Sequence, residues 1–252
     1  MIGNNTKITI IILIILANFI SHSALAAITR DANSATTATS GSTVSKTLTF
    51  SYTVTAGITN RLIVAIGFEW SGTQSISSVT YAGTTMTLGK ATPTNADGET
   101  SYIYFLDNPT SGANNVVVYG VTNEAMHGNL VAHAQNYQGV RQTGTVDASG
   151  GDKGATASSI TGTVVTVADN AWAAMSGYNT GGSLVASTNA TQVSNSGNSI
   201  MVDNQTYGAI TPAGSFAMTV TSGSGNWTWA MVSFEPAASF EEISNSQIQI
   251  ID

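Results

Sequence analysis

The feature that most constrains the fold of this chain is an alternation of apolar and polar residues with a period of two. In Lys46–Val54, the residues Leu48, Phe50, Tyr52 and Val54 alternate with Thr and Ser, which predicts a strand with one buried face. Arg61–Phe68 is a denser apolar run, typical of a central strand. Helical periodicity is nearly absent. Further strands are expected at Ile76–Tyr81, Thr85–Leu88, Ser101–Leu106, Asn115–Val121, Leu130–Tyr137, Ile160–Val167, Ala171–Tyr178, Ser199–Tyr207, Phe216–Thr221 and Trp227–Phe234.

Many short strands separated by Gly, Asn, Asp and Pro indicate an all-β protein. We expect a two-sheet β-sandwich of jelly-roll or related Greek-key type. The sandwich is expected to span residues 44–236 as one domain. Residues 27–43 are rich in Ala, Thr and Ser and are expected to form a polar N-terminal arm, and residues 237–252 a C-terminal tail.

The N-terminal 26 residues have the pattern of a secretory signal peptide. Lys7 is their only charge, an apolar run covers residues 8–20, and Ala24-Leu25-Ala26 matches a cleavage site. A membrane-spanning helix needs about 20 apolar residues, and this run is shorter. We therefore expect export to the cell surface or medium, with no stable transmembrane anchor after cleavage. The alternative is a retained, pilin-like helix in a filament core.

Charge is scarce, at 8% of residues, and the chain has no cysteine. After cleavage, the chain would contain six basic and fourteen acidic residues, which gives a formal net charge of −8. The basic residues are scattered, which argues against nucleic acid as a partner. Because acid–base, nucleophilic and metal chemistry use charged residues, His and Cys, few reactive sites can be built. Without disulfides, stability must come from a buried core.

Four blocks of the sequence stand out: Asn60–Gly67 (NRLIVAIG), Ile76–Thr87 (ISSVTYAGTTMT), Tyr104–Gly112 (YFLDNPTSG) and Asn136–Gln142 (NYQGVRQ). In this order they resemble a module that recurs in bacterial secreted and surface proteins. The module's blocks read approximately N-R-L-L-V-V-x-V, S-S-V-T-Y-G-G-x-x-L-T, W-Y-L-x-N-P-x-x-G and F-x-G-V-D-Q.

The resemblance spans roughly residues 44–235, with Ala82 in place of a Gly and Arg141 in place of an Asp. It implies a β-sandwich building block of extracellular proteins, without established catalytic residues.

Two arrangements would support catalysis or metal binding. Glu69 and Glu235, at strand ends, are the candidate carboxylate pair of a glycoside hydrolase. His127 and His133 lie six residues apart and could bind zinc together with Glu124, but no third ligand has diagnostic spacing. We assign no catalytic residue and no zinc site from the sequence, and expect a non-enzyme.

Aromatic residues give the alternative of a carbohydrate-binding module. Trp227 and Trp229 are two residues apart and therefore share one face of a strand, and Trp70 is a further candidate. If that face is exposed, the rings would form a platform for a polysaccharide. If the sheet is covered on both sides, they are core residues, which is the favoured interpretation.

Calcium is the one cofactor for which the sequence offers candidates. Asp97 and Glu99 lie in one acidic loop, and Asp147 and Asp152 in another. Carboxylate oxygens suit Ca²⁺, but neither loop matches a complete calcium-binding motif.

The C-terminal tail suggests self-assembly. Ile248 and Ile250 alternate with Gln, and Ile251 follows. Such a segment could add as a strand to the sheet edge of a neighbouring subunit. The alternatives are an intramolecular edge strand or a frayed terminus. The sequence thus favours a non-catalytic extracellular structural or adhesive protein whose partners are itself or other surface components.

Overall fold

A computed structural model describes residues 25–40, 44–69, 72–92, 98–122 and 128–238. Residues 27–237 pack as one compact unit, whereas residues 1–26 and 238–252 form a separate one. In the second unit, Leu25 and Ala238 form an isolated antiparallel bridge. The predicted signal peptide, except for its last two residues, and the tail residues Ile248, Ile250 and Ile251 lie outside the described residues.

Strands dominate the compact unit, together with one short 3-10 helix at Gln205–Tyr207. The strands are β1 (Thr29–Ser40), β2 (Ser45–Val54), β3 (Arg61–Phe68), β4 (Gln74–Tyr81), β5 (Thr84–Thr85), β6 (Thr87–Ala91), β7 (Thr100–Asp107), β8 (Gly112–Thr122), β9 (Asn129–Gln138), β10 (Ala148–Val165), β11 (Trp172–Asn179), β12 (Val185–Ala186), β13 (Thr191–Ser196), β14 (Ser199–Asp203) and β15 (Ser215–Phe234).

The first nine strands form a jelly roll. One sheet has the order β2-β8-β4-β5 and the other the order β1-β9-β3-β7-β6, with antiparallel pairing throughout. The chain crosses between the sheets so that the last strands return beside the first, as two Greek keys require. The predicted all-β sandwich of jelly-roll type is therefore confirmed.

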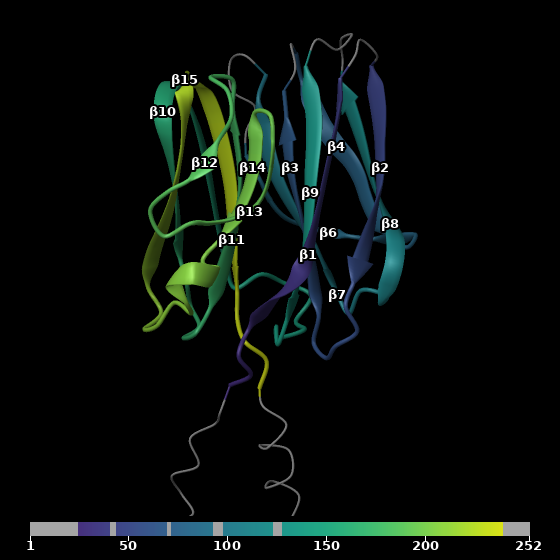
Figure 1. The fold of residues 1–252 in the computed structure, drawn as a ribbon, viewed down its shortest axis with the longest axis vertical. Coiled ribbons are helices and arrows are strands. Elements are labelled where there is room, and N and C mark those ends of the chain that lie inside the picture. The colour runs from purple at the N-terminus through teal and green to yellow at the C-terminus, as the bar shows by residue number, and fades with distance from the viewer. Residues whose placement is uncertain (1–24, 41–43, 70–71, 93–97, 123–127, 239–252) are drawn as a thin grey trace, which may run out of the picture. The chain divides into compact units, whose positions relative to one another are not determined.

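A third sheet extends this sandwich beyond the two predicted sheets. It has the order β10-β15-β11-β14-β13, and β12 pairs with β15. It covers the outer face of the β1-β9-β3-β7-β6 sheet, which becomes the middle layer (Figure 1). The physical reason lies in β3, whose eight residues are all buried, because an apolar strand needs cover on both faces.

Apolar side chains form three cores, two of them between the layers and one within the third sheet. The first lies between the two jelly-roll sheets and includes Tyr52, Val64, Phe68 and Val118. The second lies between the middle and third sheets and includes Ile63, Phe105, Tyr137, Trp172 and Phe234. The third lies within the third sheet, which curls over on itself, and includes Ile160, Met175, Met218, Val220 and Trp229.

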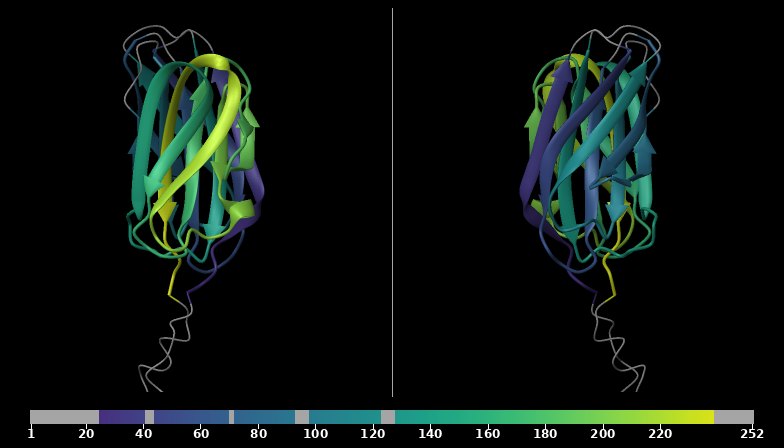
Figure 2. Two further views of the ribbon diagram at one scale, coloured as in Figure 1. Left: turned by 90° about the vertical axis from the view of Figure 1, so that its left-hand side faces the viewer. Right: turned by 90° about the vertical axis from the view of Figure 1, so that its right-hand side faces the viewer.

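The curl comes from the long paired strands β10 and β15, which bend over and return (Figure 2). A β-carbon added at Gly150 would lie 2.3 Å from the Thr163 carbonyl oxygen, so the two halves of β10 approach backbone to backbone. The Trp229 ring lies beside Gly150 and also beside Gly162. Glycines on the folded strand therefore make room for the tryptophan between its halves.

The tryptophan pair of the carbohydrate-binding hypothesis is thus placed in a core. Trp229 is only 7% exposed, and the half-buried Trp227 packs against the same cluster. Both side chains share one face, as their spacing predicts, but the outer halves of β10 and β15 cover that face. They form no exposed platform, because the sheet is covered on both sides.

The expected polar arm at residues 27–43 also differs in the structure, since Thr29–Ser40 forms strand β1. It pairs with β9 as an edge strand of the middle sheet. The segment lacks an apolar pattern because an edge strand gains its pairing from backbone hydrogen bonds while much of its surface faces water.

The close approach of the two halves of β10, called here the fold-back, predicts that one added methyl group lowers stability. We expect Gly150→Ala to lower the free energy of unfolding by about 1–3 kcal/mol, because its β-carbon collides with the Thr163 carbonyl. Gly214→Ala is the matched control, because a β-carbon there meets nothing within 4 Å. Urea unfolding followed by tryptophan fluorescence measures both, and equal stabilities would contradict the fold-back.

Candidate functional site

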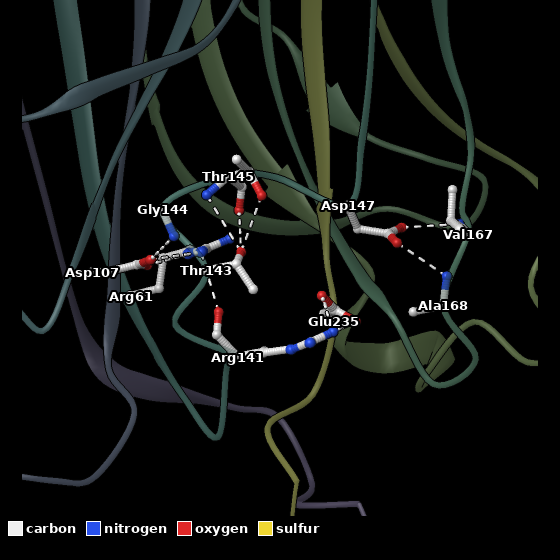
Figure 3. A network of polar contacts seen from close by, with 10 residues as sticks. All are labelled: Arg61, Asp107, Arg141, Thr143, Gly144, Thr145, Asp147, Val167, Ala168 and Glu235. Atoms are coloured by element: carbon white, nitrogen blue, oxygen red, sulfur yellow. Dashed lines mark hydrogen bonds and ion pairs between the residues drawn. The ribbon is translucent and has the colours of Figure 1, made fainter.

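The polar residues of three sequence blocks converge at one end of the middle sheet (Figure 3). Arg61 begins β3 and stands opposite Asp107, the last residue of β7, in the antiparallel register. The fourth block continues past the end of β9, beside the start of β3, to Arg141 and Gln142. The blocks are thus distant in sequence but meet in one network.

Arg61 is the centre of this network. Its Nε donates to Asp107 Oδ1 at 2.6 Å and its Nη2 to Asp107 Oδ2 at 3.0 Å, a two-pronged ion pair. Nη2 also donates to the Arg141 carbonyl at 3.2 Å. The guanidinium lies 4.7 Å from the centre of the Phe105 ring. With Arg61 only 1% exposed, these contacts offset the cost of burying its charge.

The same network fastens the segment that leads from the jelly roll to the third sheet. Asp107 Oδ2 accepts a hydrogen bond from the Gly144 amide at 2.9 Å. The backbone amide of Asn108 donates a hydrogen bond to Gln142 Oε1, and Gln142 Nε2 donates to the backbone carbonyl of Val140. Gln142, the last residue of its block, therefore has a structural role.

Arg141, in the fourth block, holds the end of β15. Its Nη1 forms an ion pair with Glu235 at 3.0 Å, and its amide donates to the Glu235 carbonyl. Glu235 is one of the two candidate carboxylates of a glycoside hydrolase. In the structure, its charge is paired with that of Arg141 (Figure 3).

The other candidate carboxylate, Glu69, lies far from Glu235. Its Oε2 accepts a hydrogen bond from the Tyr178 hydroxyl, near the end of β11. Glu235 follows Phe234, which pairs with Trp172 at the start of β11. Six residues of strand separate the two positions, about 20 Å, whereas glycosidase carboxylates lie about 5–10 Å apart. The structure does not bring the pair together.

The calcium candidates are likewise dispersed. The Asp147 carboxylate accepts hydrogen bonds from the Val167 and Ala168 amides and the Ser233 hydroxyl, and so joins the two ends of the folded β10. Asp152 accepts from the neighbouring Lys153 amide. Glu99 is buried, and Asp97 lies outside the described residues, as does Trp70. Among the described residues, no three His, Cys, Asp or Glu side chains gather in a metal-binding group.

His133 is fully buried between the middle and third sheets. Its Nδ1 lies 2.8 Å from Ser194 Oγ and 3.0 Å from Thr36 Oγ1, and its Nε2 lies 3.1 Å from Ser199 Oγ. Burial lowers the pKa of His133 to about 3, so the ring is neutral at physiological pH. His127 and Glu124, its proposed zinc partners, lie outside the described residues.

A second buried ion pair, which the sequence did not indicate, joins Arg30 of β1 to Asp203 at the end of β14. Arg30 Nη1 lies 3.1 Å from Asp203 Oδ2, and the Tyr137 hydroxyl donates to the same oxygen at 3.0 Å. Burial raises the pKa of both Asp203 and Tyr137. The pair connects the middle and third sheets. No local sequence pattern could predict it, because its two residues lie 173 positions apart in the sequence.

Both ends of the compact unit meet at Gly139. The Ala237 amide donates to the Gly139 carbonyl at 2.8 Å. A β-carbon on Gly139 would lie 2.5 Å from the Ala27 carbonyl oxygen, and its φ of 74° also favours glycine. The chain therefore enters and leaves this unit at the same end as the Arg61 network. Within the described residues, no helix is long and apolar enough to span a membrane.

Comparisons with known proteins add little. No protein-family model and no curated protein matches the chain. Among solved structures, it is similar to the crystal structure of the STIV MCP, a viral major capsid protein. The sequence identity is 11% and the TM-score 0.26, over 90% of this chain and 100% of that chain. This likeness is too low to support an argument about function.

The two arginine ion pairs at this end predict contrasting effects. We expect Arg61→Ala to lower the free energy of unfolding by about 3–5 kcal/mol, because it leaves Asp107 unpaired in a largely buried site. Arg141→Ala removes a pair whose arginine is 59% exposed and should cost about 1 kcal/mol or less. Chemical denaturation measures both variants, and similar losses would contradict a buried, central Arg61.

Buried His133 predicts that acid destabilises the fold. Unfolded His133 takes up a proton near pH 6.5, whereas the folded residue does so only near pH 3. Its contribution is therefore complete above pH 6.5 and is lost as pH falls, at up to about 1.4 kcal/mol per pH unit. Asp203, whose folded pKa is raised, acts in the opposite direction.

The comparison of wild type with His133→Gln isolates the histidine. Glutamine can still bond to the surrounding hydroxyls but does not titrate. Denaturant unfolding between pH 7 and pH 4 should show a shallower decline for the variant. Parallel pH profiles would contradict a histidine that stays neutral in the fold.

Proposed function

We propose that this chain is an exported, non-catalytic structural or adhesive β-sandwich unit that acts at the cell surface or in an extracellular matrix. The observation that carries the proposal is that Arg61, Asp107 and Gln142, which come from the sequence blocks, spend their polar groups on hydrogen bonds within the protein. Arg61 and Asp107 bind each other, Gln142 binds the backbone of Asn108 and Val140, and together they fasten the segment that leads from the jelly roll to the third sheet. A network whose polar groups are committed in this way stabilises the fold and leaves few groups for reaction with a substrate.

The position of the chain ends supports the same proposal. Because Ala27 and Ala237 both lie beside Gly139, one end of the unit carries both connections. A unit attached at one end suits a surface layer, a filament or a matrix.

Two strands at sheet edges, β2 and the returning half of β10, present neutral hydroxyl side chains outward. On β2, the exposed side chains at alternate positions are Thr47, Thr49, Ser51 and Thr53. On the returning half of β10, Thr161 and Thr163 occupy equivalent exposed positions. Edge strands of soluble proteins commonly carry charges that discourage pairing with other chains. Neutral hydroxyl-bearing strands favour association with a second copy or another surface component.

In this proposal, the C-terminal tail, residues 237–252, connects one subunit to the next. Ile248, Ile250 and Ile251 would add as a strand to a sheet edge of the next subunit. A polysaccharide partner is less well supported, because Trp227 and Trp229 pack in the core and the separated Glu69 and Glu235 do not form a glycosidase pair.

Removal of the tail tests this function. We expect the exported wild-type protein to form polymers or ordered arrays in electron microscopy and light scattering. Deletion of residues 240–252 should leave a monomer with an unchanged melting temperature. Gln247→Ser with Gln249→Ser is the matched control, because it keeps the isoleucines and should still assemble. A monomeric wild type, or polymers that persist without the tail, would refute the proposal.

A further inference from the structure

The β2-β8-β4-β5 sheet, called here the front sheet, has one covered face and one uncovered face. Its inner face packs against the middle sheet through the first apolar core. Among the described residues, no further layer lies over its outer face, which is turned toward the viewer on the right of Figure 2. The front sheet therefore differs from the middle sheet, which is covered on both faces.

Apolar residues form a row along the centre of this outer face. Alternate residues of β8 point outward, and they include Val117, Tyr119 and Val121. Tyr119 is 37% exposed, and the two valines are half-buried. Because β8 lies between β2 and β4, the row follows the middle of the sheet.

Hydroxyl-bearing residues border this row on both sides. In the strand register, each apolar residue lies between a residue of β2 and one of β4. The pairs that flank Tyr119 and Val117 are Thr47 with Ser78 and Thr49 with Thr80. The pattern across the face is thus hydroxyl, apolar, hydroxyl.

The outer face of these three strands carries no charge. The outward side chains of β2, β8 and β4 belong to Ser, Thr, Asn, Ala, Val and Tyr. The whole chain has a formal net charge of −7, so repulsion between like charges opposes contact between copies. This repulsion is weakest where two uncharged faces meet.

We propose that the front sheets of two copies pack face to face about a two-fold axis. Because the pattern is symmetrical about β8, an axis in the plane of contact brings apolar row onto apolar row and hydroxyls onto hydroxyls. Sheets packed in this way lie about 10 Å apart with interdigitated side chains. Tyr119, the largest outward side chain, packs against the apolar row of the partner copy.

The size of the face sets the strength of this contact. Three strands about 4.8 Å apart and about 30 Å long offer about 400–500 Å² per copy. A stable pair buries about 800 Å² per partner, so two free copies associate only weakly, with a dissociation constant on the order of 10⁻⁴ M. The contact rests on the proposed function, because polymers linked by the tail repeat it along their length and repeated weak contacts add. It therefore joins neighbouring polymers side by side.

Electron microscopy of the purified full-length chain, without added polysaccharide, tests the contact. We expect wild-type polymers to form bundles and Tyr119→Lys polymers to stay single, because the lysines place like charges opposite each other. Thr49→Lys, at an exposed position beside the row, is a second variant with the same expected result. Tyr207→Lys is the matched control, because Tyr207 is 52% exposed in the 3-10 helix, outside this face, and should still allow bundling.

The salt dependence gives a second readout. Bundles held by an uncharged face should persist from 20 to 500 mM NaCl, since ions screen only charged contacts. Bundles that dissolve at high salt would contradict the proposal, because charged groups elsewhere would then hold them.

The outcomes separate this contact from the role of the tail. Single wild-type polymers, or equal bundling of Tyr119→Lys and Tyr207→Lys, would overturn the face contact and leave the tail's role intact. If the full-length chain forms no polymers, the tail's role fails, and sedimentation velocity at about 100–500 µM still tests the face. A weak dimer, weakened at least tenfold by Tyr119→Lys and unchanged by Tyr207→Lys, would support it, whereas a strict monomer would overturn it. Association that requires added polysaccharide would make a glycan the occupant and would also overturn the proposal.

Discussion

The structure depends on the burial of its middle sheet on both faces. Strand β3 is apolar along almost its whole length, and all eight of its residues are buried. One face packs against the β2-β8-β4-β5 sheet and the other against the third sheet. Because the chain has no disulfides and few charges, this double cover supplies most of the apolar burial that can stabilise it. The jelly roll alone would leave residues such as Ile63 and Phe105 exposed to water.

Charged groups are few, and the structure uses them at junctions. Arg61 and Asp107 fasten the segment that leaves the jelly roll, Arg141 and Glu235 hold the end of β15, and Asp147 joins the two ends of β10. Arg30 and Asp203 join the middle and third sheets. Each lies where a strand ends or two layers meet, so the scarcity of charge reflects the few places where the fold requires it. Asp31 differs from these residues because, among the described residues, its buried carboxylate receives hydrogen bonds only from neutral donors.

Sequence patterns predicted the half-buried and fully buried strands well. Ser45–Val54 and Arg61–Phe68 lie within one residue of their expected bounds, because their apolar periodicity is strong. Strand β1 and the first half of β10 were missed, because they are built from Thr, Ser, Ala and Gly, whose pattern resembles that of a loop. The two expected strands at the end of the chain are one bent strand, β15, since glycines that usually end a strand here allow a bend.

The candidate sites were harder to predict for a related reason. The sequence singled out the blocks that contain Arg61, Asp107 and Gln142, but whether these blocks meet depends on pairing between distant strands. The spacing of Trp227 and Trp229 correctly placed them on one face, yet no local pattern shows that β10 returns to cover that face. Local periodicity identifies which side chains share a face, and only the tertiary fold decides what covers it.

Hydrogen exchange measured by mass spectrometry tests most directly whether the two halves of the chain share one core. If the middle sheet needs both covers, amides of β3 and β11 should be the slowest to exchange and should lose protection together in a single cooperative unfolding event. The contradictory result would be early exchange throughout residues 148–234 while β3 keeps full protection. In that case the jelly roll would be stable alone, and the third sheet would be an independent addition.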